Sequence, residues 1–164
     1  MLPVLALLLL FLHPVALAAA PPPSFAGTWT LDAARSSDLK PTLQRLGGPT
    51  FLASLSGQVT QVISLGPESI TVEVQTAMKN ATATMSLTEG AEITGDLFSI
   101  VYVARPRVDG NAIVATGTIT LSGEATPFET RRTVEGDVMH SVITIGSGAG
   151  ATVLDRVFVR AHPE

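Results

Sequence analysis

Histidine, serine and cysteine are the side chains that most often carry hydrolytic or metal chemistry, and this chain brings few of them together. It has no cysteine and three histidines, of which only His140 lies in the region expected to form the folded domain, while His13 and His162 lie near the two ends. Histidines so placed cannot share a zinc ion. Ser141 adjoins His140, but neighbours in a strand point to opposite faces, so adjacency creates no Ser–His pair. We therefore expect no enzyme, no cofactor and no metal site.

Size and composition indicate one compact domain. The chain has 164 residues, 46% of them hydrophobic and 15% charged, with a formal net charge of -4 and a pI near 5.3. No run of Lys or Arg could follow a phosphate backbone, so nucleic acid is not an expected partner. The absence of cysteine excludes a disulfide framework, which leaves packing to stabilise the domain. We expect a monomer.

The first twenty residues differ from the rest of the chain. An apolar run over residues 4–12 is followed by small residues, which is typical of a secretory signal peptide (residues 1–20) cleaved after Ala18 or Ala20. The run is shorter than the roughly 20 apolar residues of a membrane helix, and an uncleaved anchor is the alternative interpretation. Pro21–Pro23 then form a stiff spacer. We expect a secreted or periplasmic protein without a membrane span, in which Asn80 would be a glycosylation acceptor only in a eukaryotic host.

Two short helices are expected before the sheet begins. Ser36 or Ser37 can cap the first, which ends at Gly47-Gly48, and the second is predicted from Pro49 to Ser56. The apolar residues of the first recur at spacings of four and three residues, and those of the second lie on one side: Leu39, Leu43 and Leu46, then Phe51, Leu52 and Leu55.

From Gln58 onward the pattern is that of short strands. Runs rich in Val, Ile and Thr are separated by turn signals about 8 to 14 residues apart, which is typical of an antiparallel meander. Alternation is visible at Ile70 and Val72, whereas Phe98–Val103 is apolar on both faces and needs cover outside or a cavity inside. For residues 24–161 we predict an all-β fold, an up-and-down antiparallel β-barrel of about ten strands capped by the helix pair.

Three short motifs follow one another in an order seen in a known family. Phe25–Leu31 reads Phe-x-Gly-Thr-Trp-x-Leu, Thr76–Asn80 is followed by Leu87–Glu89, and Asp155–Phe158 ends the last strand with Arg-Val-Phe. In this arrangement the chain resembles the intracellular fatty-acid-binding proteins and their bacterial relatives, in the calycin group that includes the lipocalins. The resemblance covers about residues 24 to 160 and implies the same capped barrel, although most members of that family are cytosolic.

The resemblance also implies where a ligand carboxylate would bind. The family uses an arginine on the last strand, a tyrosine two residues later and a second arginine two strands earlier. Carried over, these are Arg156, Phe158 in place of the tyrosine, and Arg131, with Arg132 expected on the opposite face. The missing hydroxyl at Phe158 removes one hydrogen bond, worth about 1 kcal/mol or somewhat more. The alternative is an inward Arg156 that is paired with an acidic residue.

As the resemblance implies, we expect a carrier of a hydrophobic ligand, in first place a fatty acid, held in the barrel cavity. The helix pair would be the lid, and methionines would line the wall, the residues being Leu39, Leu43, Phe51, Leu55, Met78 and Met85. One alternative is a non-catalytic envelope or extracellular interaction module with a filled barrel, and another is a barrel enzyme that acts on a lipid. The cavity volume discriminates, because a ligand site needs roughly 300 Å³ or more of concave space.

Trp29 is the only tryptophan of the chain. Phe25, Gly27, Trp29 and Leu31 share one parity, which places them on the inner face of the first strand. We interpret Trp29 as a plug at the floor of the barrel, with Gly27 leaving room for it.

Overall fold

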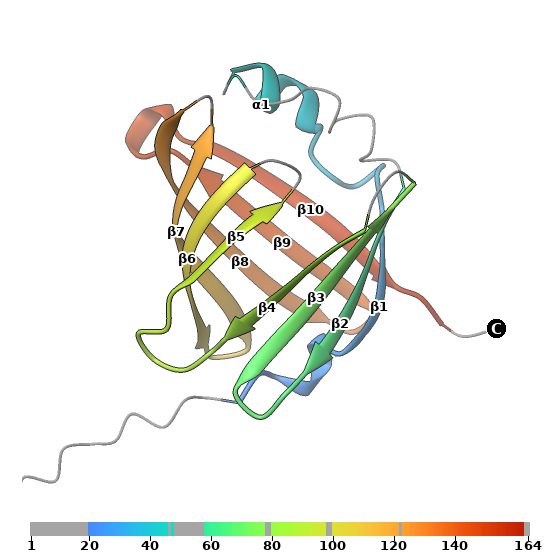
Figure 1. Ribbon diagram of the computed structural model, residues 1–164. Coiled ribbons are helices and arrows are strands. Elements are labelled where there is room, and N and C mark those ends of the chain that lie inside the picture. The colour runs from blue at the N-terminus through green and yellow to red at the C-terminus, as the bar shows by residue number, and fades with distance from the viewer. Residues whose placement is uncertain are drawn as a thin grey trace, which may run out of the picture.

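The computed structural model describes residues 20–45, 47, 58–77, 80–97, 100–121 and 123–162. These residues contain ten strands (Figure 1): β1 (Gly27–Leu31), β2 (Val59–Leu65), β3 (Ser69–Thr76), β4 (Asn80–Ser86), β5 (Ile93–Leu97), β6 (Ile100–Asp109), β7 (Ala112–Leu121), β8 (Glu124–Glu135), β9 (Val138–Ile145) and β10 (Thr152–Arg160). They also contain one α-helix and two short 3-10 turns: α1 (Leu39–Arg45), η1 (Pro23–Phe25) and η3 (Gly148–Gly150).

The strands form a single antiparallel sheet that curls into a nearly closed barrel. Each strand pairs with the next from β1 to β4 and from β5 to β10, and β1 also pairs with β10. Strands β4 and β5 approach each other, but no ladder joins them in the described part of the chain. The predicted up-and-down barrel is thus confirmed, with one break in its wall.

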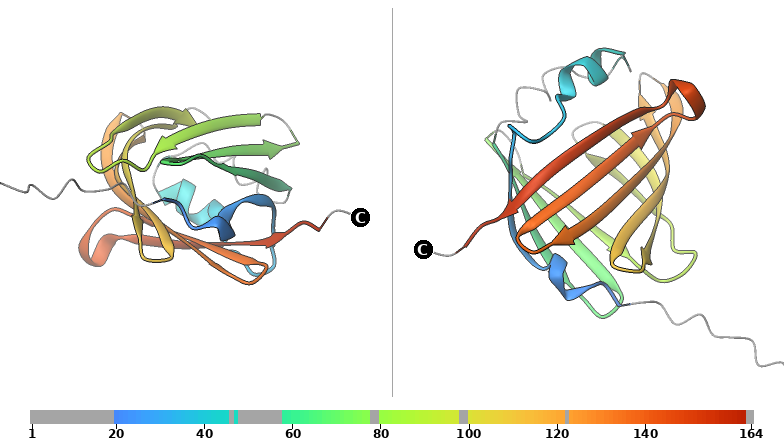
Figure 2. Two further views of the ribbon diagram at one scale, coloured as in Figure 1. Left: turned by 90° about the horizontal axis from the view of Figure 1, so that it is seen from below. Right: turned by 180° about the vertical axis from the view of Figure 1, so that it is seen from behind.

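Helix α1 lies across one end of this barrel, and η1 lies at the opposite end (Figures 1 and 2). The first predicted helix is present as α1, whereas the second, over Pro49–Ser56, falls outside the described residues. Among the described residues, we find no helix with the length and hydropathy needed to cross a membrane.

The alternation of side chains divides the sheet into an inner and an outer face. Ile70 and Val72 of β3 are buried inside, as their spacing predicted. On β6, whose start is apolar on both faces, Ile100 and Tyr102 line an internal cavity while Val101 faces outward and is 44% exposed. A cavity inside the barrel, rather than an outer cover, therefore accounts for this strand.

The base of the barrel is closed by Trp29 and Arg160. Trp29 is fully buried, and its Nε1 donates a 2.9 Å hydrogen bond to the carbonyl of Phe25. The Arg160 guanidinium lies 4.1 Å from the centroid of the Trp29 ring and donates hydrogen bonds of 2.7 Å and 2.8 Å to the carbonyls of Ala26 and Ser24. The inward position of Trp29 is confirmed.

The predicted reason for Gly27 is wrong. A Cβ at Gly27 would lie 2.7 Å from Nη1 of Arg160, so the glycine leaves room for the arginine and not for Trp29. The end of β10 is thereby clamped onto the start of the folded chain.

We expect Arg160→Met to lower the free energy of unfolding by about 2 kcal/mol or more, because two charge-assisted hydrogen bonds and a cation–π contact are lost together. Urea denaturation followed by Trp29 fluorescence measures this change. The matched control is Arg107→Met, which removes an exposed guanidinium from the outer face of β6 and should change stability by less than about 0.5 kcal/mol. Equal effects of the two substitutions would show that Arg160 is no clamp.

Candidate functional site

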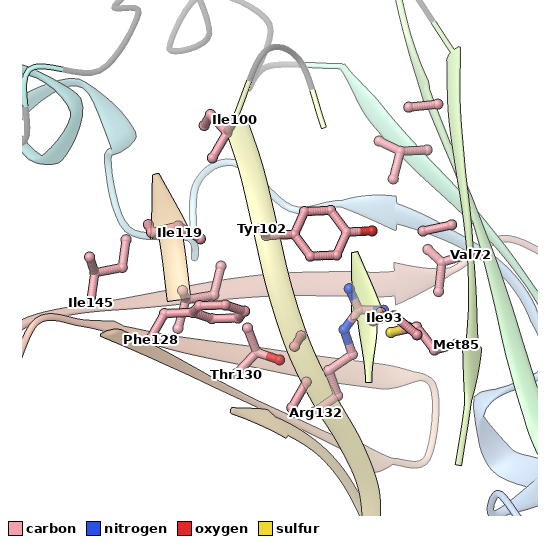
Figure 3. A pocket seen from close by; sticks show the side chains of 16 residues that line it. Val72, Met85, Ile93, Ile100, Tyr102, Ile119, Phe128, Thr130, Arg132 and Ile145 are labelled. Atoms are coloured by element: carbon pink, nitrogen blue, oxygen red, sulfur yellow. The ribbon is translucent and has the colours of Figure 1, made fainter. Parts of the chain in front are cut away.

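A cavity of about 290 Å³ lies inside the barrel (Figure 3). Thirteen of its sixteen lining residues are apolar, and the exceptions are Tyr102, Thr130 and Arg132. The apolar lining comes from seven strands: Val72, Val74, Ala81, Ala83, Met85, Ile93, Ile100, Ala104, Ala115, Ile119, Phe128, Ile143 and Ile145. Such a space suits the hydrophobic part of a small molecule, with few groups available to bind a polar end.

The register of β8, β9 and β10 decides which arginines face this space. Arg132 lies opposite Ser141 of β9, and Ser141 lies opposite Arg156 of β10, so these residues form one inward row across three strands. Phe128 and Thr130, four and two residues before Arg132, point the same way and line the cavity. Arg131 must then face outward.

Arg132 is the cationic group of the cavity, which contradicts the prediction that it lies on the outer face of its strand. Its Nη1 is buried and has no hydrogen-bond partner among the described residues. Burial lowers the pKa of the Arg132 guanidinium to about 10. The Arg132 side chain as a whole is partly exposed, and it lines the cavity. At neutral pH it is a charged side chain without a counter-ion in the described part of the chain.

Arg131 was predicted to point inward, and this orientation is wrong. Its Nη1 lies 2.6 Å from a carboxylate oxygen of Asp109 on the outer face, where both side chains are about half exposed. The hydrogen bond from Arg131 lowers the pKa of the Asp109 carboxyl. Register explains the error, since the residues of a strand change face with a shift of one position.

Arg156 is buried inside the barrel as the resemblance implied, and it is 8% exposed. Its Nη1 donates a 3.1 Å hydrogen bond to the carbonyl of Ser37, just before α1. Burial lowers the pKa of the Arg156 guanidinium, and the charge of Asp38 opposes that shift. Arg156 is not among the residues that line the cavity, so its hydrogen-bonded contact is with the segment leading to the helix.

The other predicted site residues divide into three groups. Met85 lines the cavity. Phe158 packs in the hydrophobic core opposite Met139 and Leu31. On α1, Leu43 is buried and Leu39 is partly buried. Phe158, Leu43 and Leu39 are not among the residues that line the cavity. Three residues lie outside the described part of the chain: Phe51, Leu55 and Met78.

Sequence reasoning missed Tyr102. The alternation of Ile100, Tyr102 and Ala104 along β6 would have placed all three on one face, but apolar residues between them obscured the pattern. Burial raises the pKa of the Tyr102 phenol and so favours its neutral form, which can donate a hydrogen bond.

His140 and Asp155 form a pair on the outer face of β9 and β10, away from the cavity. Nδ1 of His140 lies 2.9 Å from a carboxylate oxygen of Asp155, and both side chains are about two-fifths exposed. In the part of the chain that the structure describes, no group of three or more His, Cys, Asp or Glu residues could hold a metal ion.

No protein-family model and no curated protein matches the chain, but solved structures do. A fatty-acid-binding protein of Schistosoma mansoni in complex with arachidonic acid has a TM-score of 0.70 at 17% identity, over 86% of this chain and 98% of that one. The REP1-NXSQ fatty acid transporter has a TM-score of 0.68 at 19% identity (85% and 97%). Fatty-acid-binding protein 1 of Echinococcus granulosus has a TM-score of 0.68 at 14% identity (85% and 98%). The fatty-acid-binding-protein-like fold expected from the sequence is confirmed.

We expect Arg132→Met to stabilise the ligand-free protein at pH 7 by about 1–3 kcal/mol, because it removes a buried charge and keeps the apolar volume. The sign follows from the lowered pKa: below about pH 10 the folded and unfolded chains are both charged at this site, and burial of the charge weakens the fold. As the pH rises above that value, the folded chain releases the proton first, so the advantage of the variant should shrink. Urea denaturation at pH 7 and above pH 10 measures it.

The matched control is Arg131→Met, which breaks an exposed ion pair and should change stability by about 0–1 kcal/mol in the destabilising direction. A loss of stability in Arg132→Met at pH 7 would contradict an unpaired buried charge.

Proposed function

We propose that this protein is a carrier that holds a fatty acid, or a similar small hydrophobic acid, inside its barrel in the periplasm or outside the cell. The observation that carries the proposal is the Arg132 guanidinium, which borders an apolar cavity and has a buried nitrogen without a hydrogen-bond partner among the described residues. A charge removed from water is costly unless a counter-charge and hydrogen bonds compensate for it. A carboxylate in the cavity would supply both.

The same arrangement explains why the ligand should be an amphiphile. The cavity wall is almost entirely aliphatic or aromatic, so a ligand gains by burying a hydrocarbon chain there. A guanidinium binds a carboxylate with two parallel hydrogen bonds, which orients the charged end. A hydrocarbon alone would leave Arg132 unpaired, and a small acid without a chain would leave the wall uncovered.

We propose that Arg156, although outside the cavity lining, reinforces this binding site. It occupies the same inward row as Arg132, two strands away, and neighbouring strands are roughly 5 Å apart. One of its nitrogens is bonded to the carbonyl of Ser37, which leaves its other N–H groups available to an anion. Two guanidinium groups in one row attract an anion more strongly than either does alone.

The solved structures of the same fold support this choice of ligand. They are described as fatty-acid-binding or fatty acid transport proteins, and one holds arachidonic acid. A filled interaction module fits less well, because the lumen contains a cavity close to the smallest volume of ligand pockets. An enzyme fits less well because, among the described residues, the side chains lining the cavity include no carboxylate or imidazole to serve as acid or base.

A binding assay tests the proposal directly. Residues 21–164, which contain every described helix and strand, should bind dodecanoate more tightly than dodecanol when both are titrated by calorimetry. Arg132→Met should weaken dodecanoate binding by about tenfold to a hundredfold, the worth of a hydrogen bond to a charged group, and should leave dodecanol binding nearly unchanged.

Two controls complete the assay. Arg131→Met removes a neighbouring guanidinium from the outer face and should not affect either ligand. Arg156→Leu should weaken the acid more than the alcohol if the second arginine takes part. Failure to bind fatty acids and retinoids, together with native mass spectrometry that finds no copurifying lipid, would rule out a carrier.

The proposed location rests on the signal-peptide pattern of residues 1–20. Expression of the full chain in its host, or in a bacterium with a secretory route, should give a mature protein that begins at Ala19 or Pro21. N-terminal sequencing of the protein from the periplasm or medium tests this. Recovery of an uncleaved chain from the membrane fraction would instead support an anchor.

A further inference from the structure

Tyr102 lines the cavity but is not part of the carboxylate site that the resemblance to fatty-acid-binding proteins implies. It is the single tyrosine of the chain and lies on β6, where its side chain borders the cavity. In the described part of the chain, its hydroxyl has no hydrogen bond to another residue. Tyr102 is partly buried and borders the cavity, so its unpaired hydroxyl is open to a ligand there.

The position of the Tyr102 ring is fixed by a glycine on the neighbouring strand. Gly95 of β5 lies directly opposite Tyr102, and a Cβ built on Gly95 would collide with the hydroxyl and ring atoms of Tyr102. The backbone of Gly95 is ordinary strand and needs no left-handed conformation, so its lack of a side chain serves only to admit the ring. A glycine inside a strand lowers the stability of the sheet. The room that the Tyr102 ring needs explains why a glycine is nevertheless present at position 95.

Tyr102 and Arg132 direct their polar ends to the same side of the cavity. Figure 3 shows the hydroxyl and the guanidinium both extending toward Met85 and Val72, while Ile119, Phe128 and Ile145 occupy the other side. The two side chains come from different strands, β6 and β8, with β7 between them. The cavity therefore has one polar side with a cation and a neutral donor, and one apolar side.

We propose that the Tyr102 hydroxyl donates a hydrogen bond to the ligand headgroup that Arg132 binds, and so takes the place of the hydroxyl that is missing at Phe158. The acid then lies with its carboxylate between Tyr102 and Arg132 and its hydrocarbon chain against Ile119, Phe128 and Ile145. This inference rests on the proposed function. It adds a second recognition residue, and it predicts that the protein selects acids over matching alcohols by two contacts rather than one.

The test compares Tyr102→Phe with the unchanged protein. The substitution keeps the ring over Gly95 and removes only the hydroxyl, so the fold should be unaffected. We expect dodecanoate to bind about tenfold more weakly or worse, as for the loss of a hydrogen bond to a charged group, and dodecanol to lose less. The control is Thr118→Val, which removes an exposed hydroxyl from the outer face of β7 and should not reduce the preference for the acid.

The single tyrosine also provides a direct signal. Ultraviolet titration of the phenol should show that saturating dodecanoate raises the pKa of Tyr102, because a nearby carboxylate and a donated hydrogen bond both favour the neutral phenol. Saturating dodecanol should produce no comparable shift. A role in packing alone would leave the titration the same with both ligands.

The outcomes separate this inference from the proposed function. If the unchanged protein binds neither ligand, the carrier function itself is wrong. If it binds dodecanoate in an Arg132-dependent way, but Tyr102→Phe binds as well as before and the tyrosine titration does not respond, the carrier function stands and the role of Tyr102 is overturned. Equal losses of acid binding in Tyr102→Phe and Thr118→Val would also overturn it, because Thr118 lies on the outer face of β7 and cannot contact the ligand.

Discussion

The barrel depends on the meeting of its first and last strands. Strands β1 and β10 pair over only three residue positions, from Trp29 opposite Arg160 to Leu31 opposite Phe158. The Arg160 guanidinium reinforces this short ladder by stacking on Trp29 and bonding to carbonyls that precede β1. Without that junction the strands would separate into two sheets, β1–β4 and β5–β10, with four edges in all, and their inner faces would not enclose a space. The cavity therefore exists because residues 134 positions or more apart in the chain are held together at its base.

Closure also means that the register of each strand determines which of its side chains face the lumen. In a barrel every residue faces either the lumen or solvent, so a shift of one position exchanges the two sets. Strand β8 illustrates the consequence, since Arg131 forms an exposed ion pair with Asp109 while its neighbour Arg132 enters an apolar cavity. The two side chains are chemically identical, and only their parity in the sheet makes one a surface charge and the other a candidate binding group.

The sequence predicted the features that depend on local pattern. The strand order, the inward Trp29 and the helix after the first strand follow from alternation, turn signals and motif order, and the resemblance to fatty-acid-binding proteins implied the buried Arg156. It could not predict which of Arg131 and Arg132 points inward. A count from the nearest turn is uncertain by one residue, and a shift of one residue moves a side chain to the other face of the sheet. The roles of Gly27 and Gly95 could not be predicted either. Gly27 makes room for Arg160 and Gly95 for Tyr102, and in each case the side chain comes from a neighbouring strand whose pairing is known only from the structure.

Arg132 and Arg156 lie in one row of the sheet but differ in whether the chain itself supplies partners for the guanidinium. Arg156 is stabilised from within the chain, because the Ser37 carbonyl accepts its hydrogen bond and Asp38 contributes an opposite charge. Arg132 has a buried nitrogen with neither in the described residues. A guanidinium retained inside an apolar cavity weakens the free protein, and a ligand that binds only the folded state restores that stability through its own binding energy. Stability and recognition are thus coupled at one side chain: the greater the cost of burying Arg132 alone, the larger the part of the ligand's affinity that depends on its negative charge.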